Sequence, residues 1–357
     1  GNANKEEYYL QTANIDLSKT WWPGIMDFNG HYDGNGFLIS GMYSDRYGLF
    51  GRIDAISDTF VVKNITLTDA IIHSRGETGG IVSHVRDRRI PHIITEIFNC
   101  KFQGNILSSG DNVGGIVGYT QDRNNTYIVA CENYGNIYAM GSYIGGIIGN
   151  FDGTSRLDYY AKPTLQYCRN AGNIVGGDIV GGIVGSSAGV DVRDSYNSGN
   201  VSALGTTVGG IAGRIDSIIT FTYNHGLISG TQAGGIVGYG RDASVYATFN
   251  LGIVTSGYGI AGTELNDIAS CLVGGYFTEY TGETNPNQIY VMPSQTVGSL
   301  ELQAVEYRST LIADAKRTSI WDSIELREIP NFIDNDNTDS KFNAFMENSI
   351  NNWLVDE

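Results

Sequence analysis

The phrase NVGGIVGYT, at residues 112–120, returns four more times further along the chain. The later versions are YIGGIIGNF at 143–151, IVGGIVGSS at 179–187, TVGGIAGRI at 207–215 and QAGGIVGYG at 232–240. When the second glycine of the phrase is followed from Gly48 to Gly259, neighbouring copies are 24 to 36 residues apart. A period of this length is typical of repeat architectures, in which each copy is one structural unit.

A second phrase in each repeat indicates strands and turns. The stretches CENYGNIYAM (131–140), CRNAGNIVGG (168–177), SYNSGNVSAL (195–204) and TYNHGLISGT (222–231) align without gaps. Each repeat holds short β-branched or alternating apolar runs that Gly and Asn separate, which is a strand signal and not a helical one. Such a unit buries its apolar face only against copies of itself. The sequence therefore predicts an all-β parallel β-helix, one repeat per coil. The shortest repeats are too short for the blades of a β-propeller, which need about 40 residues.

The paired glycines are interpreted as structural. We expect them to turn the chain with φ > 0 and to leave room for the neighbouring coil, while the Ile and Val that follow enter the core. A phosphate-binding glycine loop would need a helix behind it and a Lys or Ser/Thr partner, and neither follows here.

Stacking turns aligned positions into columns. One column of small residues is predicted to contain all four cysteines, as a buried column of compact side chains and not as a metal or redox site. A second column, two residues further on, predicts a ladder of asparagine amides at a corner that tolerates left-handed backbone geometry. The small column comprises Asn64, Cys100, Cys131, Cys168, Ser195, Thr222, Thr248 and Cys271, and the asparagine column comprises Asn133, Asn170, Asn197, Asn224 and Asn250.

A third column is the candidate ligand-binding edge. An acid with an arginine nearby follows most glycine phrases, which predicts an aspartate ladder with arginine partners. Its interpretations are a solvated salt-bridge ladder, a strip that hydrogen-bonds glycans, or a cation site. The edge also carries the long inserts around 119–129 and 150–164, and binding residues often lie on such loops. The ladder comprises Asp54, Asp87, Asp122, Asp152, Asp216 and Asp242, with Arg52, Arg86, Arg123, Arg156, Arg214 and Arg241; the candidate site residues are Tyr127, Tyr159, Tyr160, Asp122, Arg123, Asp152 and Arg156.

Composition excludes several classes of partner. The 357-residue chain has a formal net charge of −16, which disfavours nucleic acid and an anionic membrane surface. No apolar run is long enough to insert into a membrane. The four cysteines are too few for a disulfide framework, and the five histidines have no ligand spacing. No cofactor is expected, calcium on the carboxylate edge being the one candidate.

The N-terminal region carries a family resemblance. The segments ANIDLS (13–18), FNGHYDGNGFLISGM (28–42) and GLFG (48–51), followed by the GGIVG repeats, resemble the GLUG-motif family of bacterial surface proteins over about residues 8–275. The resemblance implies a right-handed parallel β-helix in an exported, adhesin-like protein. The same repeat resembles a segment of the bacterial metallopeptidases that cut immunoglobulin A. Their zinc motif, H-E-x-x-H, is absent here, so the resemblance implies no protease activity.

Three regions follow from these patterns. Residues 1–47 are expected to form an N-terminal cap and first coil, and residues 48–275 the repeat body, with about eight coils in all. Residues 276–357 lose the period, and apolar residues at helical spacing predict a C-terminal cap with helical segments. No signal segment is visible at the start, and we expect it to have been removed from an exported protein.

Three functions fit the sequence. The first is a non-catalytic, adhesin-like protein, outside the cell or on its surface, that binds a glycan or a host or cell-surface protein through its loop-rich edge. The second is a polysaccharide lyase or glycoside hydrolase, whose carboxylates would occur once and not in nearly every coil. An acidic chain is also a poor host for a polyanionic substrate. The third is a passive spacer.

Overall fold

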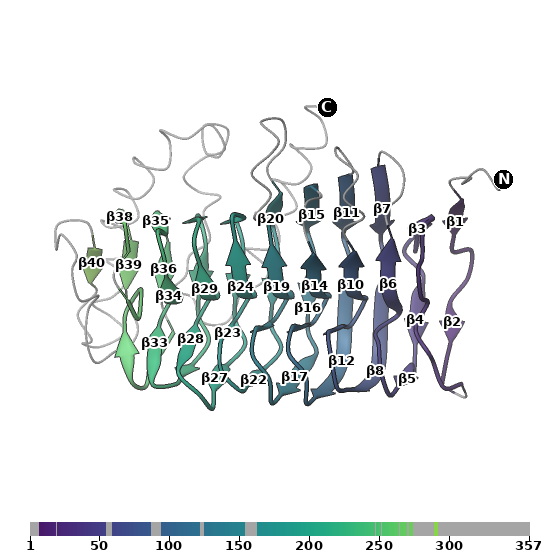
Figure 1. Cartoon of the computed structure of the whole chain (residues 1–357), viewed down its shortest axis with the longest axis horizontal. Coiled ribbons are helices and arrows are strands. Elements are labelled where there is room, and N and C mark those ends of the chain that lie inside the picture. The colour runs from purple at the N-terminus through teal and green to yellow at the C-terminus, as the bar shows by residue number, and fades with distance from the viewer. Residues whose placement is uncertain are drawn as a thin grey trace, which may run out of the picture.

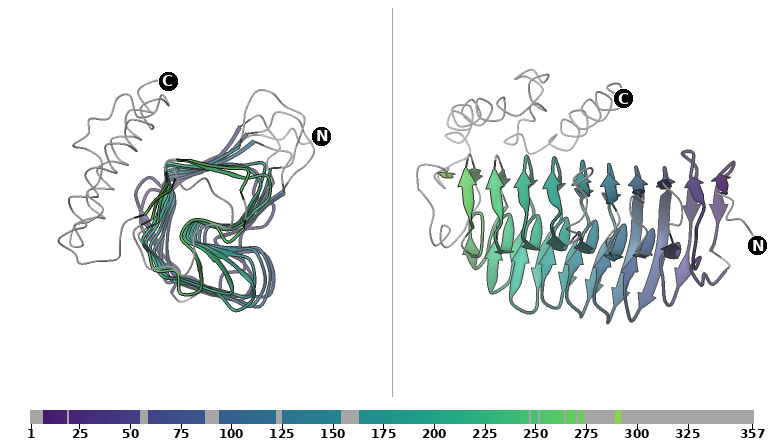
Figure 2. Two further views of the ribbon diagram at one scale, coloured as in Figure 1. Left: turned by 90° about the vertical axis from the view of Figure 1, so that its left-hand side faces the viewer. Right: turned by 45° about the horizontal axis from the view of Figure 1, so that its top comes forward.

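The computed structural model describes residues 7–18, 20–54, 59–86, 94–121, 125–153, 163–246, 248–250, 252–263, 265–269, 271–273 and 289–291. Within these residues the chain forms four sheets, in which the paired strands run parallel. Successive coils lie side by side along the long axis (Figure 1), and they overlie one another when viewed along that axis (Figure 2). The predicted all-β parallel β-helix is confirmed.

Two of the sheets consist of one strand per coil. Sheet A contains β1 (Tyr8–Leu10), β3 (His31–Asp33), β7 (Thr59–Lys63), β11 (Ile94–Phe98), β15 (Asn125–Val129), β20 (Thr164–Gln166), β25 (Asp191–Arg193), β30 (Ile218–Thr220), β35 (Ser244–Tyr246) and β38 (Asp267–Ala269). Sheet C contains β6 (Phe50–Asp54), β10 (Val82–Arg86), β14 (Val117–Gln121), β19 (Ile148–Asp152), β24 (Val184–Ala188), β29 (Ala212–Ile215) and β34 (Val237–Gly240).

The other two sheets close the coil. Sheet B contains β2 (Ile15–Asp16), β4 (Leu38–Ser40), β5 (Tyr43–Ser44), β8 (Thr66–Ser74), β12 (Lys101–Ser108), β16 (Glu132–Asn133), β17 (Asn136–Ala139), β21 (Arg169–Asn170), β22 (Ile174–Gly176), β26 (Tyr196–Asn197), β27 (Val201–Ala203), β31 (Tyr223–Asn224), β32 (Ile228–Ser229), β36 (Phe249–Asn250), β39 (Cys271–Val273) and β40 (Ile289–Val291). Sheet D contains β9 (Thr78–Gly79), β13 (Val113–Gly114), β18 (Ile144–Gly145), β23 (Val180–Gly181), β28 (Thr207–Gly209), β33 (Gln232–Gly234) and β37 (Gly257–Tyr258).

Each coil passes through the sheets in the order A, B, D, C. In the described residues sheet A has ten strands, two more than the eight coils expected. The eight from β7 onward belong to the repeat region, and β1 and β3 extend the same stack toward the N-terminus. Residues 1–47, expected to form an N-terminal cap and first coil, thus contribute β1 and β3 to the stack of coils. In the predicted C-terminal region only β40 is described, and it pairs with β39; the expected helical segments lie outside the described residues.

The core consists of apolar columns that run the length of the solenoid. Inward-facing residues of consecutive coils are directly paired, so each column repeats one side-chain type and buries it completely. In sheet A the column is Val62, Ile97, Ile128, Leu165, Val192, Ile219, Val245 and Ile268. In sheet B it is Ile72, Ile106, Ile137, Ile174, Val201 and Ile228.

The paired glycines are required by close approach of backbones, and the predicted positive φ is wrong. None of the second glycines from Gly48 to Gly235 has a φ in the left-handed region. A Cβ added to Gly182 would instead lie 2.0 Å from the carbonyl oxygen of Gly210 in the next coil and 2.5 Å from Cγ of Asn197. Only a residue without a side chain fits between these groups.

The predicted asparagine ladder is confirmed. The Nδ2 amide of each residue donates to Oδ1 of the next, at 2.7 Å from Asn133 to Asn170 and 2.9 Å from Asn224 to Asn250, and all five side chains are buried. The same Nδ2 groups of the first four asparagines donate to a nearby glycine carbonyl, as Asn197 does to Gly199 at 2.8 Å. Left-handed backbone lies three residues earlier in several coils, at Ala130, Tyr167, Asp194 and Phe221.

The predicted column of small residues is confirmed from Cys100 onward. The four thiols are free and fully buried, and burial raises the pKa of Cys100 and Cys131 well above the usual value. Asn64 does not belong to this column, because the N–H of Lys101 donates to Ile65 and therefore places Ile65 opposite Cys100. Within the described ranges, no group of His, Cys, Asp and Glu could hold a metal ion.

Gly182→Ala is expected to destabilise the solenoid by about 3 kcal/mol or more, because the added Cβ overlaps a backbone carbonyl and a buried amide. The midpoint of urea unfolding, followed by circular dichroism, measures the change. The control is Gly76→Ala, since an added Cβ at Gly76 meets nothing within 4 Å; its stability should change by less than about 1 kcal/mol. Equal midpoints for the two variants would contradict the close-approach explanation.

Asp194 is a buried carboxyl at the corner between sheets A and B. Its side chain is 2% exposed and accepts a hydrogen bond from Nε2 of Gln166 at 3.0 Å. Burial raises the pKa of Asp194 to about 7, while the Gln166 hydrogen bond and the Arg193 charge act in the opposite direction. The folded protein therefore holds a proton that the unfolded chain, at its ordinary pKa of 3.8, releases.

This raised pKa predicts pH-dependent stability. The stabilising contribution is complete below pH 3.8 and is lost as the pH rises to about 7, up to about 4 kcal/mol in total. Asp194→Asn carries no proton to lose and tolerates the positive φ, so the variant should be more stable than the parent above pH 7 and equal to it near pH 4. Thermal unfolding between pH 4 and pH 8 measures the difference; a constant offset across that range would exclude Asp194 as the titrating group.

Candidate functional site

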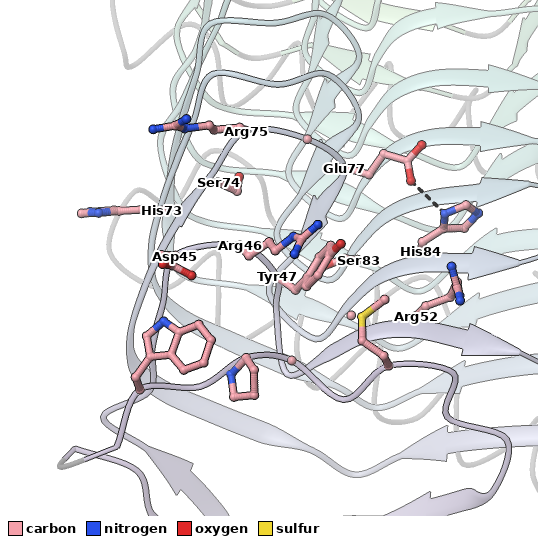
Figure 3. Close-up of a pocket in the computed structure, with 16 residues that line it drawn as sticks. Asp45, Arg46, Tyr47, Arg52, His73, Ser74, Arg75, Glu77, Ser83 and His84 are labelled. Carbon is pink, nitrogen blue, oxygen red and sulfur yellow. Dashed lines mark ion pairs between the residues drawn. The ribbon is translucent and has the colours of Figure 1, made fainter.

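An open cleft of about 1360 Å³ lies near the N-terminal end of the solenoid (Figure 3). It is lined by three arginines against two carboxylates, in a chain whose net charge is −16. The cleft therefore brings charges of both signs together with exposed aromatic surface. The lining residues are Trp21, Pro23, Gly24, Met26, Asp45, Arg46, Tyr47, Gly51, Arg52, His73, Ser74, Arg75, Gly76, Glu77, Ser83 and His84.

In the sequence WWPG at 21–24, one indole packs against the core and the other lines the cleft. Trp22 packs against the core, and its ring N–H donates to the carbonyl of Leu49 at 2.9 Å. Trp21 is 53% exposed and lines the cleft. Gly24 has a φ of +80°, and a Cβ there would lie 2.8 Å from Cβ of Tyr47, so the turn needs glycine. The anchored Trp22 thus fixes the position of Trp21 in the cleft lining.

Arg46 and Tyr47 form the centre of the cleft. The Arg46 guanidinium lies over the Tyr47 ring, 5.0 Å from its centroid (Figure 3). The buried hydroxyl of Ser44 accepts the backbone N–H of both residues, at 3.4 and 3.2 Å, and so holds this turn. Arg46 makes no ion pair with any residue that the structure describes. Its charge is oriented by an aromatic ring and is available to a ligand.

A histidine and a glutamate form one side of the cleft. Nδ1 of His84 lies 2.8 Å from Oε2 of Glu77, and the His84 ring packs against Tyr119 with centroids 5.2 Å apart. Nε2 of His84 is buried and has no hydrogen-bond partner among the described residues. Arg52, on the neighbouring coil, forms an ion pair with Asp27. His73 and Arg75 point away from Tyr47, toward the outside of the cleft (Figure 3).

Ser83, which takes the place of the last glycine of the GGIVG phrase, also lies at this cleft. The Ser83 side chain is fully buried, and its Oγ accepts the N–H of Gly48 at 2.9 Å. The hydroxyl thus binds the first glycine phrase to the next coil. Its role in the described structure is to hold the cleft wall.

Outward-facing residues of sheet C form a single row along the solenoid, here called the outer row. Their strand partners are directly paired, and the alternate residues between them face the core. The outer row consists of Arg52, His84, Tyr119, Asn150, Ser186, Arg214 and Tyr239. Burial and the carboxylates of Asp152 and Glu77 raise the pKa of Tyr119, which is consistent with both acids lying near its hydroxyl.

The predicted aspartate ladder is wrong. Asp54 pairs with Arg86 in register, with 3.8 Å between Oδ2 and Nη1, and Asp152 lies opposite Gln121 and Ala188. This column therefore mixes acids, an arginine and neutral residues. The physical reason is the strand period of two: GRID separates its arginine and acid by two residues and VRD by one, so Arg86 and not an acid lies opposite Asp54. Asp87 and Asp122 lie outside the described residues.

The predicted site residues are only partly described. Tyr127 lies on β15 in sheet A, half-buried, and burial together with Glu96 raises its pKa. Asp152 ends β19 in sheet C, so the two residues belong to different sheets. The others, Asp122, Arg123, Arg156, Tyr159 and Tyr160, lie outside the described residues.

The sequence contained a signal for the cleft that we did not use. The residues WWPG and SDRYG interrupt the repeat just before it becomes regular, and they bring an exposed indole and an arginine without any partner in the aligned columns. These segments fall almost entirely within residues 1–47, which are expected to form the N-terminal cap and first coil. The repeat alignment could not show that two coils bring them together.

Comparison with known proteins gives one structural match. No protein-family model matches the chain, and no curated protein is significantly similar to it. A solved structure of a candidate immunoglobulin A1 protease from Bacteroides ovatus is similar, with 19% sequence identity and a TM-score of 0.45. The match covers 86% of this chain and 82% of that one. In the part of the chain that the structure describes, no helix is both long and apolar enough to cross a membrane.

Proposed function

We propose that this protein is a non-catalytic, adhesin-like protein that acts outside the cell and binds a glycan in the N-terminal cleft. The observation that carries the proposal is the arrangement of Trp21, Arg46 and Tyr47. An exposed indole and a phenol line the same cleft as a guanidinium that has no carboxylate partner among the described residues.

This chemistry suits a sugar. The flat faces of Trp21 and Tyr47 offer apolar surface to the C–H face of a pyranose ring, as aromatic side chains do in binding sites. Arg46 supplies several donors in a fixed plane for hydroxyl or carboxylate oxygens. The volume of about 1360 Å³ exceeds the usual range for a small-molecule pocket, so the cleft suits a segment of an oligosaccharide.

The scaffold favours binding without rearrangement. Trp22, Ser44 and Ser83 tie the cleft to the coils through buried or partly buried hydrogen bonds, so its shape exists before the ligand arrives. A preorganised site loses little conformational freedom on binding. Location outside the cell is part of the proposal and is supported by the family resemblance. The four buried thiols are shielded from oxidants, which is compatible with an oxidising environment.

A carbohydrate-active enzyme is the second candidate, because Glu77 and His84 form a carboxylate–imidazole pair in the cleft. A base must reach the proton that it takes. Oε2 of Glu77 is bound to Nδ1 of His84, and Nε2 of His84 is buried, so the imidazole offers no free nitrogen to a ligand. This arrangement supports binding rather than turnover.

Incubation of the protein with a panel of neutral and acidic polysaccharides, with and without calcium, is expected to yield no new reducing or unsaturated ends. The physical reason is the covered Nε2 of His84. Absorbance at 235 nm and a reducing-sugar assay measure product formation. Product that the parent protein forms and the Glu77→Gln variant does not form would contradict the proposal.

Trp21→Ala and Arg46→Ala are each expected to weaken glycan binding at least about tenfold, since each removes a main contact in the cleft. A glycan array identifies the ligand, and isothermal titration calorimetry then measures the dissociation constant of each variant. Tyr138→Ala, which removes another half-exposed aromatic side chain on sheet B, is the matched control and should bind like the parent.

The same titration tests the competing surface on sheet A. If Tyr127→Ala abolishes binding while Trp21→Ala and Arg46→Ala do not change it, the ligand binds at the edge predicted from the sequence and not in the cleft. Circular dichroism of each variant establishes that the fold is retained.

A further inference from the structure

A second, smaller cleft of about 370 Å³ lies further along the solenoid. It contains two arginines, a tyrosine and two threonines around a single carboxylate. The lining residues are Asp178, Ile179, Thr206, Thr207, Arg214, Tyr239 and Arg241.

The two clefts are built from equivalent positions of different coils. Each combines members of the outer row with the turn that joins sheet B to sheet D: Arg52, His84 and residues 73–77 in the first cleft, and Arg214, Tyr239 and residues 205–207 in the second. Both therefore open on the same side of the solenoid. Five coil steps separate Arg52 from Arg214 in the outer row, which corresponds to about 24 Å at the usual strand spacing.

The second cleft repeats the chemistry of the first. The Arg214 guanidinium lies over the Tyr239 ring, 5.8 Å from its centroid, as Arg46 lies over Tyr47. Neither Arg214 nor Arg241 makes an ion pair with a residue in the described ranges.

The single acid of this cleft is already engaged. Oδ1 of Asp178 accepts the N–H and the hydroxyl of Thr206, at 2.9 and 2.8 Å, and these bonds lower the pKa of Asp178. The carboxylate holds the turn and stays ionised, and the two arginines of the cleft outnumber it.

The outer row between the clefts is uncharged. The half-buried Tyr119 and Asn150 present a hydroxyl and an amide group, which can donate to and accept from sugar hydroxyls, whereas Ser186 between them and Arg214 is buried. Asp152, near Tyr119, lies in the neighbouring column. The net charge of −16 does not decide binding here, because salt screens charges beyond about 8 Å and each cleft contains arginines without an ion pair to a described residue.

On the basis of the proposed function, we propose that the ligand is a linear acidic polysaccharide that lies across the strands along the outer row. Its anionic groups contact Arg46 at one end and Arg214 and Arg241 at the other, and its neutral hydroxyls contact Tyr119 and Asn150. Two arginine-containing clefts about 24 Å apart on one rigid face suit a repeating charged chain. A chain that reaches both gains affinity through effective concentration.

The test compares short and long acidic oligosaccharides. Calorimetric titrations use di-galacturonate, which fits one cleft, and a deca-galacturonate, which spans both; a malto-oligosaccharide of ten sugars is the neutral probe and a heparin decasaccharide the sulfated one. We expect the long galacturonate to bind at least about tenfold more tightly than the short one. A tighter heparin complex would assign the anionic groups to sulfates and would retain the shared site.

Arg214→Ala should lower the affinity for the long acidic probe about tenfold and leave that for the short probe unchanged. Lys101→Ala removes one positive charge from sheet B, away from both clefts, and is the matched control, which should not change either affinity. Arg46→Ala should weaken both probes.

The outcomes separate this inference from the proposed function. Three results would overturn the inference but leave binding in the first cleft intact. They are equal affinities for the long and short acidic probes, equal affinities for the acidic and neutral probes, and an Arg214→Ala variant that binds the long probe as the parent does. Weakening of the short probe by Arg214→Ala would move the primary site to the second cleft and also overturn it. Binding of no oligosaccharide of any kind to the parent protein would refute the proposed function itself.

Discussion

The second glycine of each repeat phrase supports the whole solenoid, because two coils come too close there for any side chain. A Cβ added to this glycine would lie about 2 Å from a carbonyl oxygen of the next coil. In the coils that carry the asparagine ladder it would also contact a ladder side chain, as at Gly182 and Asn197. The glycine brings the amides within hydrogen-bond distance of one another, and the amides satisfy glycine carbonyls that the core would otherwise bury unpaired. Register, coil spacing and the apolar columns all depend on this contact.

A scaffold that repeats so strictly leaves chemistry to the positions that face outward. Inward positions must match the coils above and below, so Val192 can be exchanged only for a residue of similar shape. Outer-row positions carry no such restriction, and they change from Arg52 to Tyr119 to Ser186 along the solenoid. The clefts arise where these varied side chains meet the turns between sheets B and D.

The charge that lines the two clefts differs from the net charge of the chain. The chain is strongly acidic as a whole, yet Arg46, Arg214 and Arg241 are not paired with described carboxylates and line the two clefts. Two acids are engaged with neighbouring side chains: Asp27 pairs with Arg52, and Asp178 accepts hydrogen bonds from Thr206. A net charge summed over the whole chain therefore does not report the charge that an individual cleft presents.

The sequence by itself determined the parallel β-helix, the asparagine ladder and the column of buried cysteines, since each depends on a period that direct alignment detects. It did not determine that glycine was needed for close approach and not for its φ, because the carbonyl of Gly210 near Gly182 belongs to another coil. It also did not show that Arg86 and not an acid lies opposite Asp54, because a one-residue difference in spacing changes the column. The sequence marked WWPG and SDRYG as departures from the repeat, but only the tertiary structure showed that they form a cleft, because Trp21, Arg46 and His84 come together when consecutive coils are stacked.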